Sequence, residues 1–224
     1  MQEICMQQQW SAVDNYLVET LIPHDPLLQQ VLENNQRAGL PAYDVAANQG
    51  QFLALLVRIT RARRVLEIGT LGGYSTIWMA RELPPDDELL TLEADPHHAQ
   101  IARQNLQLAG VDDRVTLREG PALETLESLG ERPAFDLIFI DADKPNNPHY
   151  LQWALRYSRP GTLIIGDNVV RDGEVTNPHS ADERVQGVRR FIEMMGSDPR
   201  LTVTALQTVG SKGWDGFTLA WVNG

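Results

Sequence analysis

Hydrophobic residues in the first quarter of the chain recur at the spacing of α-helices. Between residues 10 and 61 they stand three or four positions apart, as do Val13, Leu17 and Leu21, which places them on one face of a helix. Three prolines interrupt this pattern, because proline lacks the amide hydrogen that a helix interior requires. The pattern predicts three helices, which form a helical N-terminal extension over residues 1–61.

From Arg64 onward, short apolar runs alternate with amphipathic segments. Runs of this kind are typical of strands in a parallel sheet that is covered on both faces. The segments between them carry helix signals: Asp95-Pro96, for example, begins a predicted helix that Gly110 ends. The predicted strands are residues 65–68, 89–92, 115–117, 135–140 and 162–165.

Two further apolar runs lie near the end of the chain, at residues 201–206 and 217–222. The link between them, residues 209–216, is too short for a crossover helix and favours an antiparallel pair. The sequence contains no internal repeat, low-complexity tract or linker. We therefore expect one α/β domain over residues 1–224, with helices on both faces of a mostly parallel sheet.

Length and composition agree with one folded domain and exclude some partners. A chain of 224 residues can bury one core and is short for two. The composition, 42% hydrophobic and 22% charged, is that of a globular protein. The net charge of -11, with no cluster of basic residues, would repel a phosphate backbone. We expect no nucleic-acid partner.

The sequence also lacks the signals of a secreted or membrane protein. The single cysteine, Cys5, has no partner for an intramolecular disulfide, and no Cys/His spacing resembles a zinc site. The first ten residues lack the basic-then-apolar pattern of a signal peptide, and no apolar stretch could span a bilayer. These absences favour a cytoplasmic protein with no membrane segment.

A glycine-rich turn follows the first predicted strand. Gly69, Gly72 and Gly73 allow a sharp turn and the close approach of a ligand at the start of a helix. Glu93 ends the second strand twenty positions beyond Gly73, where an acid can accept hydrogen bonds from both hydroxyls of a ribose. The simpler alternative is a tight turn without a ligand.

The residues around this turn favour S-adenosylmethionine over NAD. The dinucleotide spacing G-x-G-x-x-G is absent, and Glu67 stands two residues before the first glycine. A carboxylate there would repel a pyrophosphate but could face the ammonium of a methionine moiety. A NAD-dependent dehydrogenase on a similar fold and a non-catalytic cofactor-binding scaffold remain as alternatives.

Acids also end two further strands. Asp141 follows the fourth strand, three residues before Lys144, and Asp167-Asn168 follows the fifth. Adjacent parallel strands lie about 4.8 Å apart, so these oxygens could share one ion, and a hard-oxygen set suits Mg²⁺. The alternative is that both acids are helix caps or polar strand ends. Beside a metal, Lys144 could stabilise a phenolate or, with a lowered pKa, act as a base.

Together these motifs resemble the cation-dependent class I O-methyltransferases, which include catechol and caffeoyl-CoA O-methyltransferases. The resemblance covers nearly the whole chain from about Asp14, through VLEIGTLGGYSTIWMA, TLEADPHHAQIARQNLQLAG, REGPAL, FDLIFIDADKPN, GDNVVRDGEV and VGSKGWDGF. It implies a Rossmann-like seven-stranded sheet with the last strand antiparallel, and a homodimer. We expect the N-terminal helices to form part of that dimer, through Leu17, Leu21 and Leu28.

The resemblance implies transfer of a methyl group to a hydroxyl oxygen of a small aromatic acceptor, with vicinal diols favoured. Lys144 and Asp141 would be catalytic, and Ala122 would lie near the adenine. The residues expected to contact S-adenosylmethionine are Glu67, Gly69, Thr70, Ser75, Glu93, Ala122 and Asp141, and those expected to bind a divalent metal, taken to be Mg²⁺, are Asp141, Asp167 and Asn168.

Two segments depart from the family pattern. Val169-Val170-Arg171 replaces a tryptophan that follows the Asp-Asn pair in the plant enzymes, and the last turn has extra residues around Lys212 and Trp214. These departures affect the identity of the acceptor more than the chemistry. Trp214, in a predicted glycine-rich loop, is a candidate for contact with an aromatic acceptor.

Overall fold

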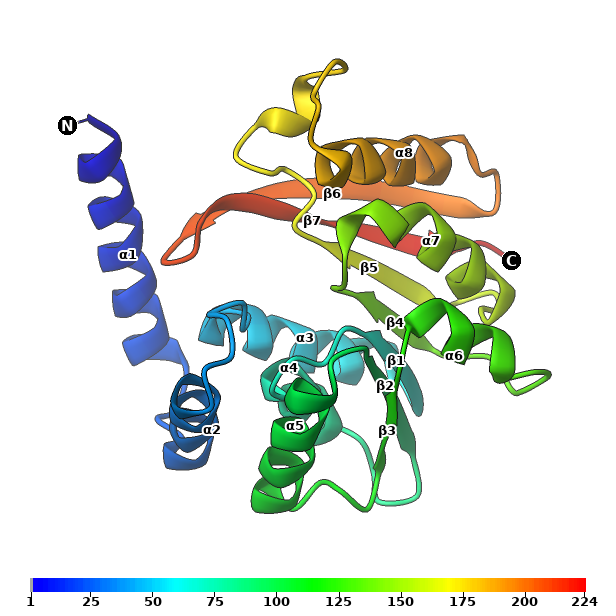
Figure 1. Ribbon diagram of the computed structural model, residues 1–224, viewed down its shortest axis with the longest axis horizontal. Helices are drawn as coiled ribbons and strands as arrows, with labels where there is room; N and C mark the ends of the chain where they lie inside the picture. The colour runs from blue at the N-terminus through cyan, green and yellow to red at the C-terminus, as the bar shows by residue number, and fades with distance from the viewer. Residues whose placement is uncertain (1) are drawn as a thin grey trace.

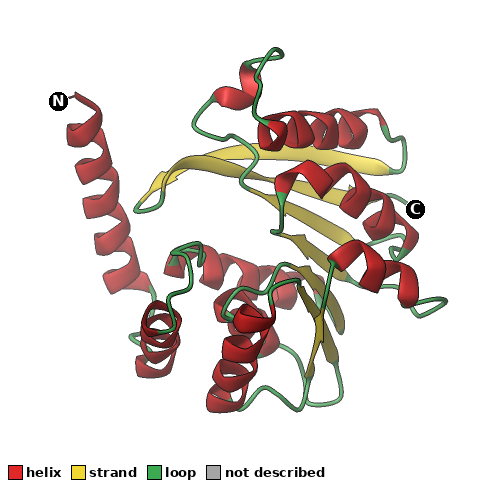
Figure 2. Cartoon of the chain, viewed as in Figure 1, coloured by secondary structure: helices red, strands yellow, loops and turns green. Residues whose placement is uncertain are grey.

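The computed structural model describes residues 2–224, and side chains from Met6 onward, so the side chain of Cys5 lies outside the described residues. The centre of the molecule is a seven-stranded sheet, drawn in yellow in Figure 2, whose strand order is β3-β2-β1-β4-β5-β7-β6. Strand β7 runs antiparallel to β5 and β6, which flank it. The strands are β1 (Arg64–Ile68), β2 (Glu88–Glu93), β3 (Val115–Glu119), β4 (Leu137–Ile140), β5 (Leu163–Asp167), β6 (Leu201–Gly210) and β7 (Gly213–Val222).

Helices cover both faces of this sheet, as the apolar runs predict. Along the central strands, alternate residues point to opposite sides: Val65 and Leu137 pack with one group of helices, and Leu66 and Ile138 with the other. Burial on both faces explains why these strands are apolar at most positions. The first group is α2 (Pro26–Arg37), α3 (Ala47–Thr60), α4 (Tyr74–Ala80) and α5 (Pro96–Ala109), and the second is α6 (Ala122–Ser128), α7 (Asn147–Arg156) and α8 (Glu183–Ser197).

Side-chain caps set the start of helices where the sequence predicts them. The Asp95 carboxylate accepts hydrogen bonds from the backbone N–H groups of His97 and His98, and Pro96 occupies the first turn. This arrangement satisfies N–H groups that have no partner within the helix. Gly110, with a φ of 64°, ends α5 in the left-handed conformation that glycine adopts readily. The predicted boundaries of this helix are confirmed.

Helix α1 (Gln2–Leu21) stands beside the two layers of helices instead of on the sheet (Figure 1). Its contacts are with α3 and with β6 near the tip of the last hairpin. Leu17 and Leu21 are 39% and 71% exposed, whereas Leu28 is 4% exposed and packs in the core. The expectation that Leu28 contributes to a dimer surface is therefore wrong. None of the helices within residues 2–224 is long and apolar enough to cross a membrane.

The last hairpin is longer than the sequence pattern predicts. Strand β6 continues to Gly210 and β7 starts at Gly213, so only Ser211 and Lys212 form the turn. Gly213, directly after the turn, has a φ of 97°, a conformation that glycine adopts readily and that is typical of the glycine that follows a type I turn in a hairpin. Trp214 consequently lies in β7, paired with Val209, and the predicted loop of residues 209–216 is wrong.

Candidate functional site

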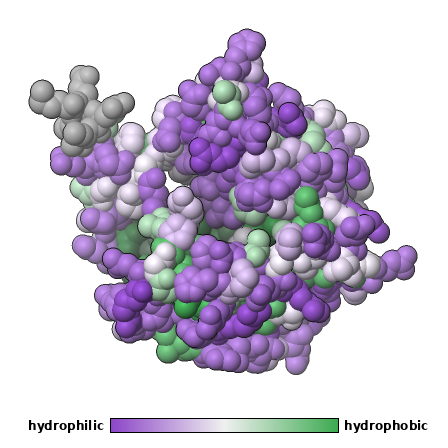
Figure 3. Space-filling view, viewed as in Figure 1, coloured by the Kyte–Doolittle hydropathy of each residue, from purple (hydrophilic) through white to green (hydrophobic). Residues whose placement is uncertain are grey.

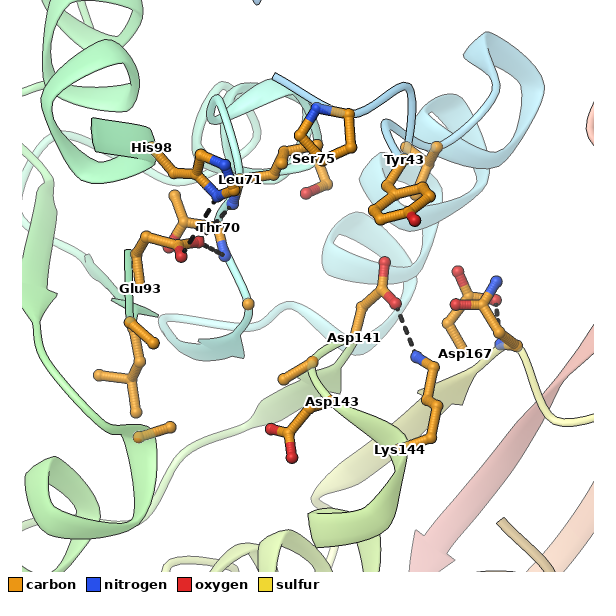
Figure 4. Close-up of a pocket in the computed structure, with 18 of the residues that line it drawn as sticks. Tyr43, Thr70, Leu71, Ser75, Glu93, His98, Asp141, Asp143, Lys144 and Asp167 are labelled. Carbon is orange, nitrogen blue, oxygen red and sulfur yellow. Dashed lines mark hydrogen bonds and ion pairs between the residues drawn. The ribbon is translucent and has the colours of Figure 1, made fainter. Parts of the chain in front are cut away.

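A cavity of about 750 Å³ opens beyond the carboxyl ends of β1, β4 and β5. The strand order reverses at β1, which lies between β2 and β4. In open α/β sheets a reversal of this kind leaves a crevice where ligands bind. The face in Figure 3 is hollowed near its middle, and Figure 4 shows that side chains from both halves of the sheet point into the cavity. The candidate residues divide into two groups, one on each side of Asp141.

The glycine turn after β1 forms the wall on one side. Gly69 has a φ of 101°, and a Cβ atom on it would lie 2.1 Å from the backbone oxygen of Asp141. Only glycine therefore lets the ends of β1 and β4 approach this closely. Gly69, Thr70 and Ser75 all line the cavity. The turn thus has a packing role as well as the ligand-binding role that the sequence suggests.

Glu93 joins the end of β2 to this turn. Its Oε2 accepts hydrogen bonds from the backbone N–H groups of Leu71, at 2.7 Å, and Thr70, at 3.2 Å (Figure 4). Its Oε1 accepts the N–H of Asp95 at 2.9 Å and lies 3.6 Å from Nδ1 of His98. Glu93 lines the cavity while holding the turn in place. The sequence suggests the first role and carries no signal for the second.

Glu67 lies behind the cavity wall. It is fully buried, and its carboxylate accepts hydrogen bonds from Ser75 Oγ at 2.6 Å and Thr91 Oγ1 at 2.7 Å, and a further one from Thr76. Burial raises the pKa of Glu67 to about 7, although the three hydroxyl groups oppose that rise and the charge of Asp141 adds to it. Because Ser75 lines the cavity, Glu67 would reach a ligand there through the Ser75 hydroxyl.

The far end of this side is apolar. Ala122 begins α6 and lines the cavity between Pro121 and Leu123. Leu92 and His98 line it as well. Small and apolar side chains beside the ribose-binding candidate Glu93 suit the flat face of a purine base. This is the position that the family resemblance implies for the adenine.

On the other side of the cavity, acids lie at the ends of two adjacent strands. Asp141 follows β4, and its Oδ1 accepts a hydrogen bond from Nζ of Lys144 at 2.9 Å (Figure 4). The Lys144 side chain is only 8% exposed. Asp167 ends β5 and is 5% exposed. The structure therefore brings Asp141, Lys144 and Asp167 to one cavity, together with Asn168.

Asp167 lies between two hydrogen-bond donors. Its Oδ1 accepts the backbone N–H of Asn168 at 2.8 Å, and its Oδ2 accepts Nε2 of Gln49 at 2.7 Å. Burial raises the pKa of Asp167, and the negative charge of Asp141 raises it further, while Lys144 lowers it. The two carboxylates repel each other, and the burial of Asp167 reduces the screening of that repulsion by water. A bound cation would offset that repulsion.

The donor set suits a cation that prefers oxygen ligands. Asn168 has a φ of 56°, which asparagine tolerates better than most residues. Within residues 6–224 its side-chain amide makes no hydrogen bond to another protein group, so its oxygen is available as a ligand. In the same part of the chain, no three His, Cys, Asp or Glu side chains gather closely enough to hold a metal. Two carboxylates and one amide would thus leave positions for water or acceptor oxygens, as Mg²⁺ tolerates.

Several lining residues are absent from the sequence-based prediction. Gln49 on α3 and Tyr43 before it come from a segment far from the acids in sequence. Asp143, which accepts a hydrogen bond from the Tyr150 hydroxyl, follows Asp141 by two positions. Its place after a strand end was the one signal that could have identified it. Trp214, by contrast, is expected from the sequence to contact the acceptor but is not among the residues that line this cavity. Its indole N–H donates a hydrogen bond to Gln207 on β6 at 3.0 Å.

Comparison with known proteins agrees with this arrangement. Residues 18–221 match the O-methyltransferase family. The chain is similar to the catechol O-methyltransferase of Mycobacterium tuberculosis, with 53% identity over 210 residues that cover 94% of each chain.

Solved structures show the same similarity over the whole fold. A chain from Klebsiella pneumoniae is 85% identical with a TM-score of 0.97, and the match covers 98% of this chain and 100% of that one. The O-methyltransferase of Bacillus cereus in complex with SAH is 56% identical with a TM-score of 0.95, over 97% and 100% of the two chains. On the family match and these identities, the chain belongs to the O-methyltransferase family.

Proposed function

We propose that this protein transfers the methyl group of S-adenosylmethionine to a hydroxyl oxygen of a small aromatic diol, with the help of a divalent metal, Mg²⁺ in our expectation. One observation carries the proposal: a single cavity joins a turn suited to a nucleoside, around Glu93, to an oxygen-ligand set, around Asp141 and Asp167. The similarity to a catechol O-methyltransferase and to an enzyme bound to SAH supports it. SAH is S-adenosylhomocysteine, the product left after methyl transfer.

On the cofactor side, each residue has a specific task in this proposal. Glu93 would accept hydrogen bonds from the ribose hydroxyls. The Ser75 hydroxyl, which donates to Glu67, keeps lone pairs for the ammonium of the methionine moiety. That ammonium would lower the pKa of Glu67 again, since a nearby positive charge favours the carboxylate. Gly69 has no side chain and would leave room for the sulfur end of S-adenosylmethionine.

On the acceptor side, Asp141, Asp167 and Asn168 would hold the metal. When bound, a divalent cation fixes two adjacent oxygens and makes a hydroxyl easier to ionise. Lys144 lies beside Asp141 and would assist the same ionisation, either as an ammonium that stabilises the phenolate or as an amine that accepts the proton. The walls of the cavity would align the oxygen with the methyl carbon for in-line displacement.

Two alternatives lose support. A NAD-dependent dehydrogenase would leave the paired acids without a role, and the matched relatives are O-methyltransferases. A non-catalytic scaffold has no need of a lysine buried beside two acids, and Lys144 is 8% exposed. Because α3 supplies Gln49 to the cavity, we also propose that the N-terminal helices and the sheet work as one domain.

A direct assay tests the proposed function. The protein is incubated with S-adenosylmethionine, catechol and Mg²⁺, and the products are identified by mass spectrometry. We expect monomethylated catechol and S-adenosylhomocysteine in equal amounts, and no product after chelation with EDTA. Binding of S-adenosylmethionine without any methylated product, across a panel of vicinal diols, would contradict the proposed acceptor class.

Glu93→Ala is expected to weaken S-adenosylmethionine binding. A hydrogen bond to a charged group is worth about 1.5 to 3 kcal/mol, or roughly 10- to 150-fold in Kd. The loss includes the anchoring of Thr70 and Leu71, whose N–H groups Glu93 accepts. Titration calorimetry measures Kd, and metal affinity should barely change. Glu93→Gln keeps one acceptor oxygen and should lose less, whereas unchanged affinity in a folded Ala variant would place the ribose elsewhere.

Gln49→Ala is expected to weaken metal binding by roughly 10- to 100-fold, the usual effect of removing a group that orients a ligand. Gln49 donates to Asp167 Oδ2 at 2.7 Å and so fixes the direction of the other oxygen. Calorimetric titration with Mg²⁺ or Mn²⁺ provides the measurement. Gln51→Ala, two residues along the same helix, is the matched control. Equal metal affinity in both variants would show that Gln49 has no part in orienting Asp167.

We also propose that the protein is a homodimer, formed in part by α1. Val13, Tyr16 and Leu21 on this helix are 57%, 66% and 71% exposed, and apolar side chains that gather on an exposed surface often mark a protein–protein interface. Light scattering should give twice the 25.1 kDa of one chain. Leu21→Asp should shift the mass toward one chain, and Leu108→Asp on α5 should not. A fully active protein with the mass of one chain would refute the dimer.

A further inference from the structure

Basic side chains gather on the acceptor side of the cavity. Besides Lys144, three Lys or Arg residues of the described chain line it: Arg171, Arg184 and Lys212. They come from three separate segments, the loop after β5, the start of α8 and the turn between β6 and β7. The cavity lining also holds five acids, Asp44, Glu93, Asp141, Asp143 and Asp167, so its charges are mixed. A basic group there that has hydrogen-bond donors to spare can bind an anionic ligand.

Of these three, Arg171 has unused hydrogen-bonding capacity. Its buried Nε has no hydrogen-bond partner within residues 6–224. Its nearest carboxylate is Asp215, whose Oδ2 is 3.8 Å from Nη1, too far for a hydrogen bond. The other oxygen of Asp215 accepts the backbone N–H groups of Val170, Arg171 and Gly216. Asp215 therefore shapes the loop and forms an ion pair with Arg171 without a hydrogen bond to it, so the terminal nitrogens of the guanidinium remain able to donate to a ligand.

The loop that holds Arg171 has an uncommon backbone. Asn168, Arg171 and Asp172 have φ angles of 56°, 56° and 54°, a region that non-glycine residues rarely occupy. Such conformations persist where surrounding contacts impose them, and they cluster at binding sites. Here the Asp215 carboxylate accepts the N–H groups of Val170 and Arg171 and so holds the loop at Arg171. Arg171 is thus held three residues from the proposed metal ligand Asn168.

The other two basic residues are less suited to bind a ligand directly. Arg184 donates three hydrogen bonds to the Asp182 carboxylate, at 2.7 to 3.1 Å, and its side chain is 61% exposed. Nζ of Lys212 donates to the backbone oxygen of Ala42 at 3.3 Å. Both lie where solvent screens their charge. Arg171, with a side chain 25% exposed, is the least screened of the three.

We propose that Arg171 binds a carboxylate on the acceptor, so that the preferred acceptors are aromatic vicinal diols that carry an acid group. The inference rests on the proposed function above and names the acceptor class for the same cavity. With the diol oxygens at Asp141, Asp167 and Asn168, a substituent on the ring could extend toward the loop of Arg171. A planar guanidinium matches a carboxylate through two parallel hydrogen bonds. A neutral catechol would leave that guanidinium without a partner.

Two acceptors that differ in one group test the proposal. We compare kcat/KM for 3,4-dihydroxybenzoate with kcat/KM for catechol, in the full chain and in Arg171→Gln. The unaltered protein should prefer the acid, and Arg171→Gln should reduce that preference roughly 10- to 100-fold, as expected for a lost charge-assisted hydrogen bond. Arg171→Lys keeps the positive charge but not the two parallel N–H donors, so it should retain part of the preference for the acid. Arg190→Gln, exposed on α8, is the matched control and should leave the preference unchanged.

A binding measurement separates this inference from the proposed function. Titration calorimetry with 3,4-dihydroxybenzoate, in the presence of S-adenosylhomocysteine and Mg²⁺, should show the same loss of affinity in a folded Arg171→Gln. If Arg171→Gln lowered kcat/KM equally for 3,4-dihydroxybenzoate and catechol, the proposed role of Arg171 would be overturned. The same holds if the unaltered protein showed no preference for the acid. Absence of methyl transfer to either acceptor, with binding of the acid still dependent on Arg171, would instead contradict the reaction and leave the carboxylate site standing.

Discussion

Asp167→Ala is expected to abolish both metal binding and methyl transfer to a catechol. Asp167 is one of two carboxylates in the proposed ligand set, and it is held by Gln49 and by the N–H of Asn168 at the end of β5. Changes to groups that only orient a ligand already cost roughly 10- to 100-fold in affinity or activity. Removing an anionic ligand should lower metal affinity and activity by at least as much. We expect the same result for Asp141→Ala. Calorimetric titration with Mg²⁺ and a turnover assay measure the two effects.

The control for this prediction is Asp112→Ala, which removes an exposed acid near the start of β3. It should leave metal affinity and turnover unchanged. Thermal unfolding of Asp167→Ala tests for misfolding, which would otherwise explain a loss of activity. Full activity of the unaltered protein after exhaustive chelation would contradict the metal hypothesis. Asp141 and Asp167 would then be ordinary acids at strand ends.

Lys144→Ala is expected to lower kcat while leaving metal binding largely intact. The Lys144 ammonium lies 2.9 Å from Asp141 Oδ1 and next to the place where the acceptor hydroxyl would ionise. A phenolic hydroxyl has a pKa near 10, and a positioned acid–base group typically contributes about 10²- to 10⁴-fold. The defect should grow as the pH falls, because the hydroxyl then ionises less readily without help. Steady-state kcat and KM measured across pH provide the test.

Lys144→Arg distinguishes the two roles left open for this residue. Arginine keeps the positive charge but does not lose its proton, so partial rescue indicates stabilisation of the phenolate and no rescue indicates a base. Loss of metal affinity equal to the loss of kcat in Lys144→Ala would contradict both roles. It would show that the lysine serves only to position Asp141.

The overall fold could be predicted because its signals are local. Strands buried on both faces must be apolar at successive positions, as Leu66 and Val65 are, and a cap such as Asp95-Pro96 acts within one turn of helix. The same logic extends to the candidate site. Parallel strands end at one edge of a sheet, so the acids Asp141 and Asp167 could be expected to meet before any coordinates were known.

Other features depend on contacts between residues distant in sequence. Gln49 reaches Asp167 across 118 positions, and no local pattern marks either residue for the other. Leu28 has the spacing of an exposed helical face, yet it packs in the core because α2 lies against α4 and α5. Glycines around Lys212 suggest a loop, while pairing of Val209 with Trp214 makes most of that segment a hairpin.

Features that the sequence predicts and features that it does not differ in the range of the interactions that cause them. Periodicity, capping and strand-end chemistry act over a few residues, so the sequence by itself determined the α/β class, the approximate elements and the edge of the sheet where the cavity lies. Burial and charge pairing act through space. Only the tertiary structure decided that Glu67 lies behind Ser75, that Glu93 holds the glycine turn, and that Arg171 lines the cavity without a side-chain hydrogen bond from its Nε to the described residues.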